Sequence, residues 1–195
     1  MTEIELKAHV ADPAATEKKI GTFATFRRET EKFDAYWTNG NAARKAVKVR
    51  IREEGGITVV TYKKKERQGA IEVNDEKEFS IDNREAFETL ITDLGFSCDS
   101  LKHKKTKSFD YVVSDGADST RVTVELSLVD PIGWFVEIEI LKDNPDGETI
   151  ERSRKILGET LRLCGISEGA IEMRYYTEMI AAANRAQSLS DGDQP

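Results

Sequence analysis

Charged and apolar residues alternate at the start of the chain. Alternation places Glu3, Glu5 and Lys7 on one face of a strand. Ile4 and Leu6 fall on the opposite face. Two carboxylates at this spacing can hold a divalent cation, and the lysine beside them can bind an anion, as phosphate-transfer chemistry requires. The same pattern is typical of a strand whose polar face lies in water, so this segment alone leaves both interpretations open.

A second alternating segment carries basic residues on its polar face, at Lys48, Arg50 and Arg52. Guanidinium groups bind phosphate oxygens through two parallel hydrogen bonds, and the lysine adds a compact positive charge. An isolated triplet of this kind is more often a solvated strand face, so its meaning depends on the strands around it.

Composition limits the class of protein. The chain of 195 residues suits one domain, which we place at residues 1–187, with a disordered polar tail at 188–195. Its 29 Lys and Arg against 36 Asp and Glu give a net charge of −7, which argues against a nucleic-acid partner. Cys98 and Cys164 lack the spacing of a zinc site or a disulfide framework. No segment approaches the roughly 18 apolar residues of a membrane helix, so we expect a cytoplasmic protein.

Alternation and turn signals predict about eight strands. Residues 47–52 and 57–65 predict a hairpin, because Gly55 and Gly56 lie between them. Besides the first segment, the other predicted strands are 33–37, 71–81, 105–113, 120–128 and 134–141. Amphipathic periodicity predicts helices at 13–28, 83–94, 146–163 and 168–185.

These elements predict an α+β fold, an eight-stranded antiparallel β-barrel with amphipathic helices packed outside. If helices cover the apolar strand faces, the charged faces line an interior that has room for one small ligand. Such a lining is costly unless its charges compensate each other or hold ions and ligand. An open sheet with its charged face in water is the alternative, and periodicity does not separate the two. The predicted lining is Glu3, Glu5, Lys7, Lys48, Arg50, Arg52, Lys63, Glu76, Glu78, Lys105, Lys107, Arg121, Thr123, Glu125, Glu137 and Glu139.

Short motifs along most of the chain resemble those of one family, in the same order. Glu3 to Lys7 is similar to a Glu-x-Glu-x-Lys signature, residues 47–52 to a Leu-Arg-Ile-Arg strand, and residues 61–63 and 76–78 to the lysine-bearing and acidic strands that follow. Lys105-x-Lys107 resembles a Lys-x-Arg element, residues 133–139 a Gly-x-Phe-x-Glu-x-Glu strand, and residues 174–180 a Ser-Tyr-x-Glu-Leu-Leu close. The chain thus resembles the CYTH domain, or triphosphate tunnel metalloenzyme superfamily, and within it the class IV adenylyl cyclase-like branch.

The resemblance implies a tunnel in which basic residues bind a triphosphate-containing small molecule and glutamates hold Mg²⁺ or Mn²⁺. The implied metal residues are Glu3, Glu5, Glu137 and Glu139, with Glu78 and Glu125 as helpers. The implied substrate-binding residues are Lys7, Arg50, Arg52, Lys63, Lys105 and Lys107, which Lys48 and Arg121 join through strand phase. Catalysis would fall to Glu3, Glu5, Lys7 and Lys63. A homodimer is plausible for the family, although no motif supports it here.

Two reactions share this machinery. Attack by water on the terminal phosphorus makes a triphosphatase of inorganic, nucleoside or thiamine triphosphate, and attack by the ribose 3′-hydroxyl on the α-phosphorus makes an adenylyl cyclase. We expect the triphosphatase, because only Met1 and Thr2 precede the first glutamate, where class IV cyclases often carry a His-Phe element. A non-catalytic polyphosphate or nucleotide sensor is a further alternative, against which the carboxylate pairs argue.

Overall fold

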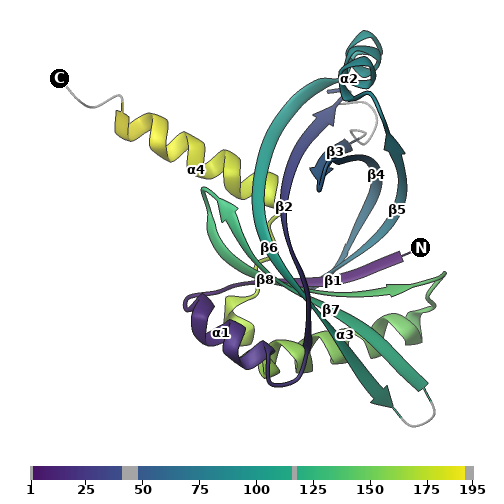
Figure 1. Cartoon of the computed structure of the whole chain (residues 1–195), viewed down its shortest axis with the longest axis vertical. Coiled ribbons are helices and arrows are strands. Elements are labelled where there is room, and N and C mark those ends of the chain that lie inside the picture. Colours follow the sequence, from purple (N-terminus) through teal and green to yellow (C-terminus); the bar gives the residue numbers. More distant parts are fainter. Residues whose placement is uncertain (1, 41–47, 116–117, 192–195) are drawn as a thin grey trace.

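The structure, a computed structural model, describes residues 2–40, 48–115 and 118–191. Within these ranges, eight antiparallel strands form a strongly curled sheet that closes on itself in the order β1-β5-β4-β3-β2-β6-β7-β8 (Figure 1). The strands are β1 (Thr2–His9), β2 (Thr25–Thr38), β3 (Lys48–Glu54), β4 (Ile57–Gln68), β5 (Ile71–Ile81), β6 (Ser97–Asp115), β7 (Asp118–Asp130) and β8 (Gly133–Lys142). The helices are α1 (Pro13–Ile20), α2 (Arg84–Asp93), α3 (Gly147–Leu163) and α4 (Tyr176–Asp191), with a 3₁₀ turn η1 (Glu168–Ala170) before α4. The predicted α+β class, with an antiparallel sheet and helices outside it, is confirmed.

Local sequence explains where most elements begin and turn. Asp12, Asn83 and Asp146 accept hydrogen bonds from backbone N–H groups of the first turns of α1, α2 and α3, as N-cap residues do. Gly55 and Gly56 have φ angles of 59° and 79°, the two positive values that a tight turn between β3 and β4 requires.

The helix predicted at residues 13–28 is too long. Helix α1 ends at Ile20, and Thr25 already belongs to β2, which pairs with β6. Phe26 there contacts Phe109 of β6 edge to face, with ring centroids 5.6 Å apart. Pairing with a distant strand therefore overrides the local helical pattern. Val47, at the start of the predicted segment 47–52, lies outside the described residues.

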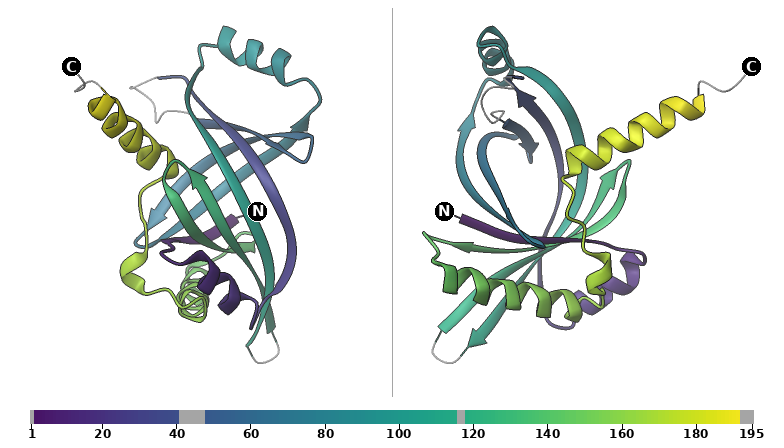
Figure 2. Two further views of the ribbon diagram at one scale, coloured as in Figure 1. Left: turned by 60° about the vertical axis from the view of Figure 1, so that its left-hand side comes forward. Right: turned by 180° about the vertical axis from the view of Figure 1, so that it is seen from behind.

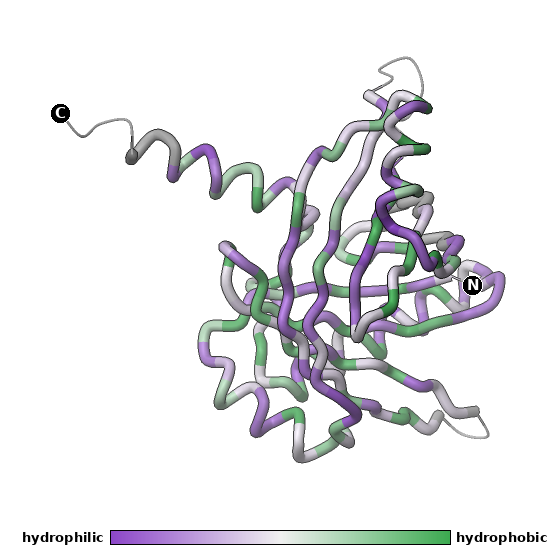
Figure 3. The backbone as a smooth tube through the Cα atoms, turned by 45° about the horizontal axis from the view of Figure 1, so that its top comes forward, coloured by the Kyte–Doolittle hydropathy of each residue, from purple (hydrophilic) through white to green (hydrophobic). Residues whose placement is uncertain are grey.

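The main hydrophobic core lies between the outer face of the barrel and two helices. Helix α3 contacts β1 and β8, and α1 contacts β7. Ile4 and Ile138 from the strands and Leu157 from α3 are fully buried in this core. The two views of Figure 2 show α1 and α3 on the same side of the sheet, and Figure 3 shows hydrophilic and hydrophobic positions alternating along the strands.

The other two helices have smaller contacts. Ile91 of α2 packs on Ile51 and Val60 of β3 and β4. Helix α4 is anchored by its first turns, where Met179 and Ile180 are buried, and its remainder extends away from the barrel (Figure 1). It continues to Asp191 and so includes the first residues of the tail that we expected to be disordered. Among the described residues, no helix is long and apolar enough to span a membrane.

We expect Leu157→Ala to lower the free energy of unfolding by about 2–5 kcal/mol, because it leaves a cavity between α3 and the barrel. Leu101→Ala is the matched control, since Leu101 is 67% exposed, and it should change stability by less than about 0.5 kcal/mol. Urea unfolding followed by circular dichroism measures both. Equal effects would show that the outer face of the barrel is not the core.

Candidate functional site

Ion pairs reach across the inner face of the barrel between strands that are not neighbours. Lys32 Nζ of β2 lies 2.9 Å from Glu125 Oε1 of β7, although β6 separates these strands. Lys104 Nζ of β6 lies 2.9 Å from Glu125 Oε2 and also contacts the carboxylate of Glu137 on β8. These four side chains therefore form one cluster on the concave side of the sheet, in which the lysines are buried and the glutamates are partly buried.

The cluster shifts the pKa values of its members. Burial alone would raise the pKa of Glu125, but the ammonium groups of Lys104 and Lys32 outweigh it and lower that pKa. The pKa of Glu137 is lowered in the same way, mainly by Lys104. Burial would also lower the pKa of Lys104, but the two carboxylates raise it. All three groups are thus held in their charged forms.

A second cluster surrounds Asp34, which sequence reasoning did not identify. Arg52 donates from Nε to Asp34 Oδ1 at 2.6 Å and from Nη2 to Oδ2 at 2.9 Å. Lys102 Nζ lies 2.9 Å from Oδ2, and the Tyr36 hydroxyl donates to the same oxygen at 3.3 Å. Burial would raise the pKa of Asp34, but Lys102 and Arg52 hold it well below its usual value.

Arg50 lies in a third group on the same face. It donates from Nη2 to Thr61 Oγ1 at 2.9 Å and to Glu78 Oε1 at 3.1 Å, and Thr61 donates to Glu78 at 2.7 Å. The Nε of Arg50 is buried and has no hydrogen-bond partner among the described residues. A buried donor of this kind is unfavourable unless an acceptor is supplied, which a bound oxyanion would do.

One glutamate of the first strand, Glu5, is in register with carboxylates on both neighbouring strands. Glu5 of β1 lies opposite Glu72 of β5 on one side and Glu139 of β8 on the other. One step along, Lys7 lies opposite Glu137, which lies opposite Glu125. Directly opposed residues share a face, so acidic side chains from three neighbouring strands line one wall of the barrel. Glu72 was not predicted.

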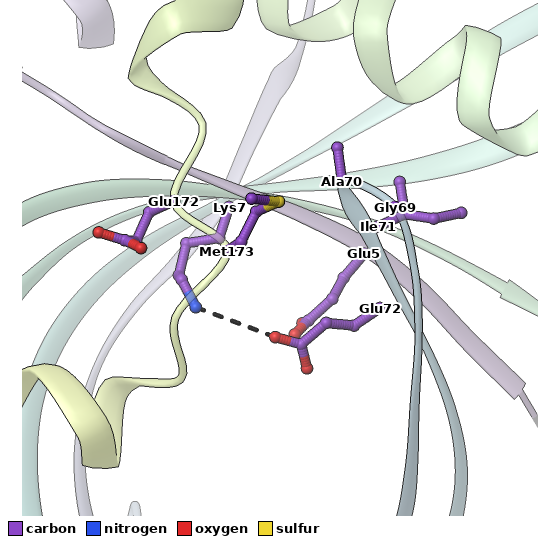
Figure 4. Close-up of a pocket in the computed structure, with 8 residues that line it drawn as sticks. All are labelled: Glu5, Lys7, Gly69, Ala70, Ile71, Glu72, Glu172 and Met173. Carbon is purple, nitrogen blue, oxygen red and sulfur yellow. Dashed lines mark ion pairs between the residues drawn. The ribbon is translucent and has the colours of Figure 1, made fainter.

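Lys7 is tied to the segment that precedes α4. Its Nζ donates to the Arg174 carbonyl at 2.7 Å and lies 4.0 Å from Glu72, toward which it points in Figure 4. The Lys7 carbonyl in turn accepts from the N–H of Glu172 at 2.9 Å. The ammonium group also lies 4.6 Å from the ring centroid of Tyr176, a second contact that we did not predict.

The placement predicted for Lys105 and Lys107 is wrong. Lys105 is exposed and lies 3.6 Å from Glu31, and Lys107 pairs with Glu17 of α1 at 2.8 Å, both on the outer face. Lys102 and Lys104 point inward instead. A shift of one residue in strand phase exchanges the two faces. The signal that could have revealed it is Phe109, which has the parity of Lys105 and Lys107 and belongs to the outer core.

The remaining predicted residues are placed as follows. Lys48 and Arg121 have exposed side chains near strand ends. Glu3 lies opposite Asn74 of β5. The backbones of Lys63 and Glu76 pair between β4 and β5, but their side chains lie outside the described part of the structure.

Comparison with known families decides the relationship that the motifs suggested. Residues 1–176 match the CYTH domain. The chain belongs to the CYTH family. Members of this family are generally triphosphate tunnel metalloenzymes, which bind triphosphate substrates and typically use divalent metals. A comparison with curated protein sequences gives no match.

Solved structures share the CYTH fold along nearly the whole chain. PH1819 from Pyrococcus horikoshii is 25% identical, with a TM-score of 0.74 over 93% of this chain and 99% of that one. A candidate adenylate cyclase from Vibrio parahaemolyticus is 20% identical, with a TM-score of 0.71 over 93% and 98%. HpAC1 from Hippeastrum, for which a dominant triphosphatase activity is described, is 14% identical, with a TM-score of 0.60 over 93% and 96%. The likeness to the last two shows the fold alone.

The donor chemistry of this CYTH chain fits a hard divalent cation. Carboxylate oxygens are the ligands that Mg²⁺ and Mn²⁺ prefer, and Glu5, Glu72 and Glu139 occupy opposed positions on three strands. The described residues contain no group of three acidic, histidine or cysteine side chains gathered closely enough to hold an ion. Glu125 and Glu137 are paired with lysines. The residue types therefore fit a metal, and the carboxylates would have to gather around it.

We expect Lys104→Met to lower the free energy of unfolding by about 3–5 kcal/mol at pH 7, because Glu125 and Glu137 lose a buried cation. In the wild type these depressed pKa values give stability that is present above about pH 4 and lost as the pH falls through the folded-state pKa. In the variant the carboxylates protonate at higher pH, so the difference from wild type should shrink between pH 7 and about pH 4. Urea unfolding at several pH values measures it.

Lys105→Met is the matched control. Lys105 is 57% exposed, so its removal should change stability by less than about 0.5 kcal/mol at any of these pH values. A large loss in the Lys105 variant and none in the Lys104 variant would reverse our assignment of the two faces of β6.

Proposed function

We propose that this CYTH protein hydrolyses a triphosphate that binds on the inner face of its barrel. The observation that carries the proposal is the arrangement of Arg50 and Arg52, two guanidinium groups that neighbouring carboxylates orient on the same concave face. Arginine forks match the geometry of phosphate oxygens, and a triphosphate chain offers several such groups.

Each basic residue would have a distinct part in holding the phosphate chain. Arg50 has a buried Nε that lacks an acceptor, and Arg52 uses only its Nε and Nη2 in pairing with Asp34. Lys32, Lys102 and Lys104 add positive charge that is buried and therefore poorly screened by solvent. Such groups would stabilise the charge that develops on the leaving phosphate, which is the principal demand of phosphoryl transfer.

The carboxylates would have a different part. Glu3, Glu5 and Glu139 would hold a divalent cation, with Glu72 as a further donor of the same chemistry. When bound, such an ion neutralises phosphate oxygens and lowers the pKa of water. Glu125 and Glu137 would mainly keep Lys104 charged and hold Lys32 and Lys104 in place. Lys7 would lie at the end of the site, where the segment before α4 contacts it.

Hydrolysis and cyclisation differ in the attacking oxygen and therefore in their products. The purified protein should be incubated with tripolyphosphate, ATP and thiamine triphosphate, each with Mg²⁺ or Mn²⁺, and phosphate, pyrophosphate and cyclic AMP measured separately. We expect phosphate and a diphosphate product. Cyclic AMP with an equal amount of pyrophosphate would make the protein a cyclase, and binding without turnover would make it a sensor.

Arg50→Gln should lower kcat/KM for the best of these substrates about 100-fold, as expected for removal of one preorganised charged donor. Lys107→Gln removes one positive charge from the outer face and should leave kcat/KM within about twofold of the wild type. Thermal unfolding of both variants checks that they are folded. Equal loss in both variants would place the substrate away from the inner face.

A further inference from the structure

Asp34 occupies a position that is unusual for a carboxylate in a site proposed to bind an anion. Its side chain is completely buried, and it faces Arg52 and Lys102. A negative charge among these groups repels a second anion and so opposes its binding. Its presence therefore requires a physical account.

The geometry of the Arg52 pair supplies one. Asp34 accepts from Nε and Nη2, which lie along one edge of the planar guanidinium group. The outer end of the fork, formed by Nη1 and the second N–H of Nη2, is not used in this pair. That end can donate two parallel hydrogen bonds to a phosphate while the side remains on Asp34.

The other contacts of Asp34 keep the arrangement fixed. Lys102 Nζ pairs with Oδ2, and the Tyr36 hydroxyl donates to the same oxygen. Lys102 also lies over the rings of Tyr36 and Tyr176, at 5.6 and 4.8 Å from their centroids. Without the carboxylate, the two cations would repel each other, and Arg52 would lose the partner that fixes the orientation of its guanidinium group.

We propose that Asp34 is a positioning residue, which holds Arg52 side-on and Lys102 beside it so that both present ordered donors to the triphosphate. The inference rests on the proposed function, because it concerns the orientation of groups in the same site. The proposal and a simple count of charges predict opposite changes in anion affinity when Asp34 is neutralised. Loss of the Asp34 charge should weaken binding of an anion, whereas charge alone predicts tighter binding.

The test compares wild type, Asp34→Asn and Glu17→Gln by calorimetric titration with tripolyphosphate in the absence of metal. Asp34→Asn keeps the side-chain shape and removes the charge, and its Kd should rise about tenfold, as for loss of one charge-assisted hydrogen bond. With the metal present, KM should rise by a similar factor while kcat changes less than about threefold. Glu17→Gln removes a carboxylate that pairs with Lys107 on the outer face, and its Kd should match the wild type.

A second measurement needs no variant and covers the case in which Asp34→Asn does not fold. In wild-type protein, the Arg52 Nε–H should give a separate, slowly exchanging NMR signal that persists when tripolyphosphate binds. Disappearance of this signal on binding would show that the anion displaces Asp34, which would overturn the proposal. So would an unchanged or lower Kd in Asp34→Asn. If the wild type neither binds nor hydrolyses any triphosphate, the proposed function itself fails, and this outcome is distinct from the others.

Discussion

Charge compensation on the inner face of the barrel is the constraint that the other features of this fold satisfy. Lysines and arginines from β2, β3 and β6 lie among carboxylates from β2, β5, β7 and β8. A buried charge without a partner costs several kcal/mol. Each buried cation therefore needs a carboxylate that lies within ion-pair distance and is suitably oriented. Lys104 meets this condition by bridging Glu125 and Glu137, which lie on two neighbouring strands. The ion pairs thus depend on strand register, and a one-residue slip would break all of them.

The same alternation determines what the helices do. Glu5 and Lys7 of β1 and Glu137 and Glu139 of β8 share the inner face, and the residues between them are apolar and point outward. Ile4 and Ile138 are examples, and α3 covers them with Leu157. The chain then continues from α3 through η1 to Tyr176, whose ring contacts Phe135 at 5.1 Å between centroids. The chain that leaves α3, the helix covering the outer core, therefore places Tyr176 beside inner-face residues of the barrel. Burial, with Glu137 nearby, raises the pKa of Tyr176 well above its usual value.

Sequence alone was sufficient for the elements in which one face is clearly apolar. The phase of β1, β3 and β8 could be predicted because residues such as Ile51 and Ile138 define the outer face without ambiguity. The phase of β6 was predicted wrongly because the predicted segment, residues 105–113, begins after the inward lysines Lys102 and Lys104, and the parity of Phe109 was not weighed against that of Lys105 and Lys107. Asp34 was missed for a related reason, since one acidic residue in a short predicted strand has no periodic partner. Its contacts are with Arg52 of β3 and Lys102 of β6, and the pairing of β2 between these two strands cannot be read from the local sequence.

The balance of charge also bears on the kind of ligand that this face suits. A phosphate chain without a counter-ion would compete with Glu125 and Glu137 for Lys32 and Lys104 and would leave those carboxylates less well compensated. A divalent cation without a phosphate chain would neutralise the carboxylates near Glu5 but would leave the buried Nε of Arg50 without an acceptor. The two together add less net charge than the phosphate chain alone, and the carboxylates near Glu5 would face the cation while the guanidinium groups would face the phosphates. A lining with opposed carboxylates on β1, β5 and β8 and two guanidinium groups on β3 therefore favours a metal–triphosphate pair over either ion alone. Side-on pairs such as Asp34 with Arg52 make this possible, because they satisfy an arginine internally and still leave one end of its fork for the ligand.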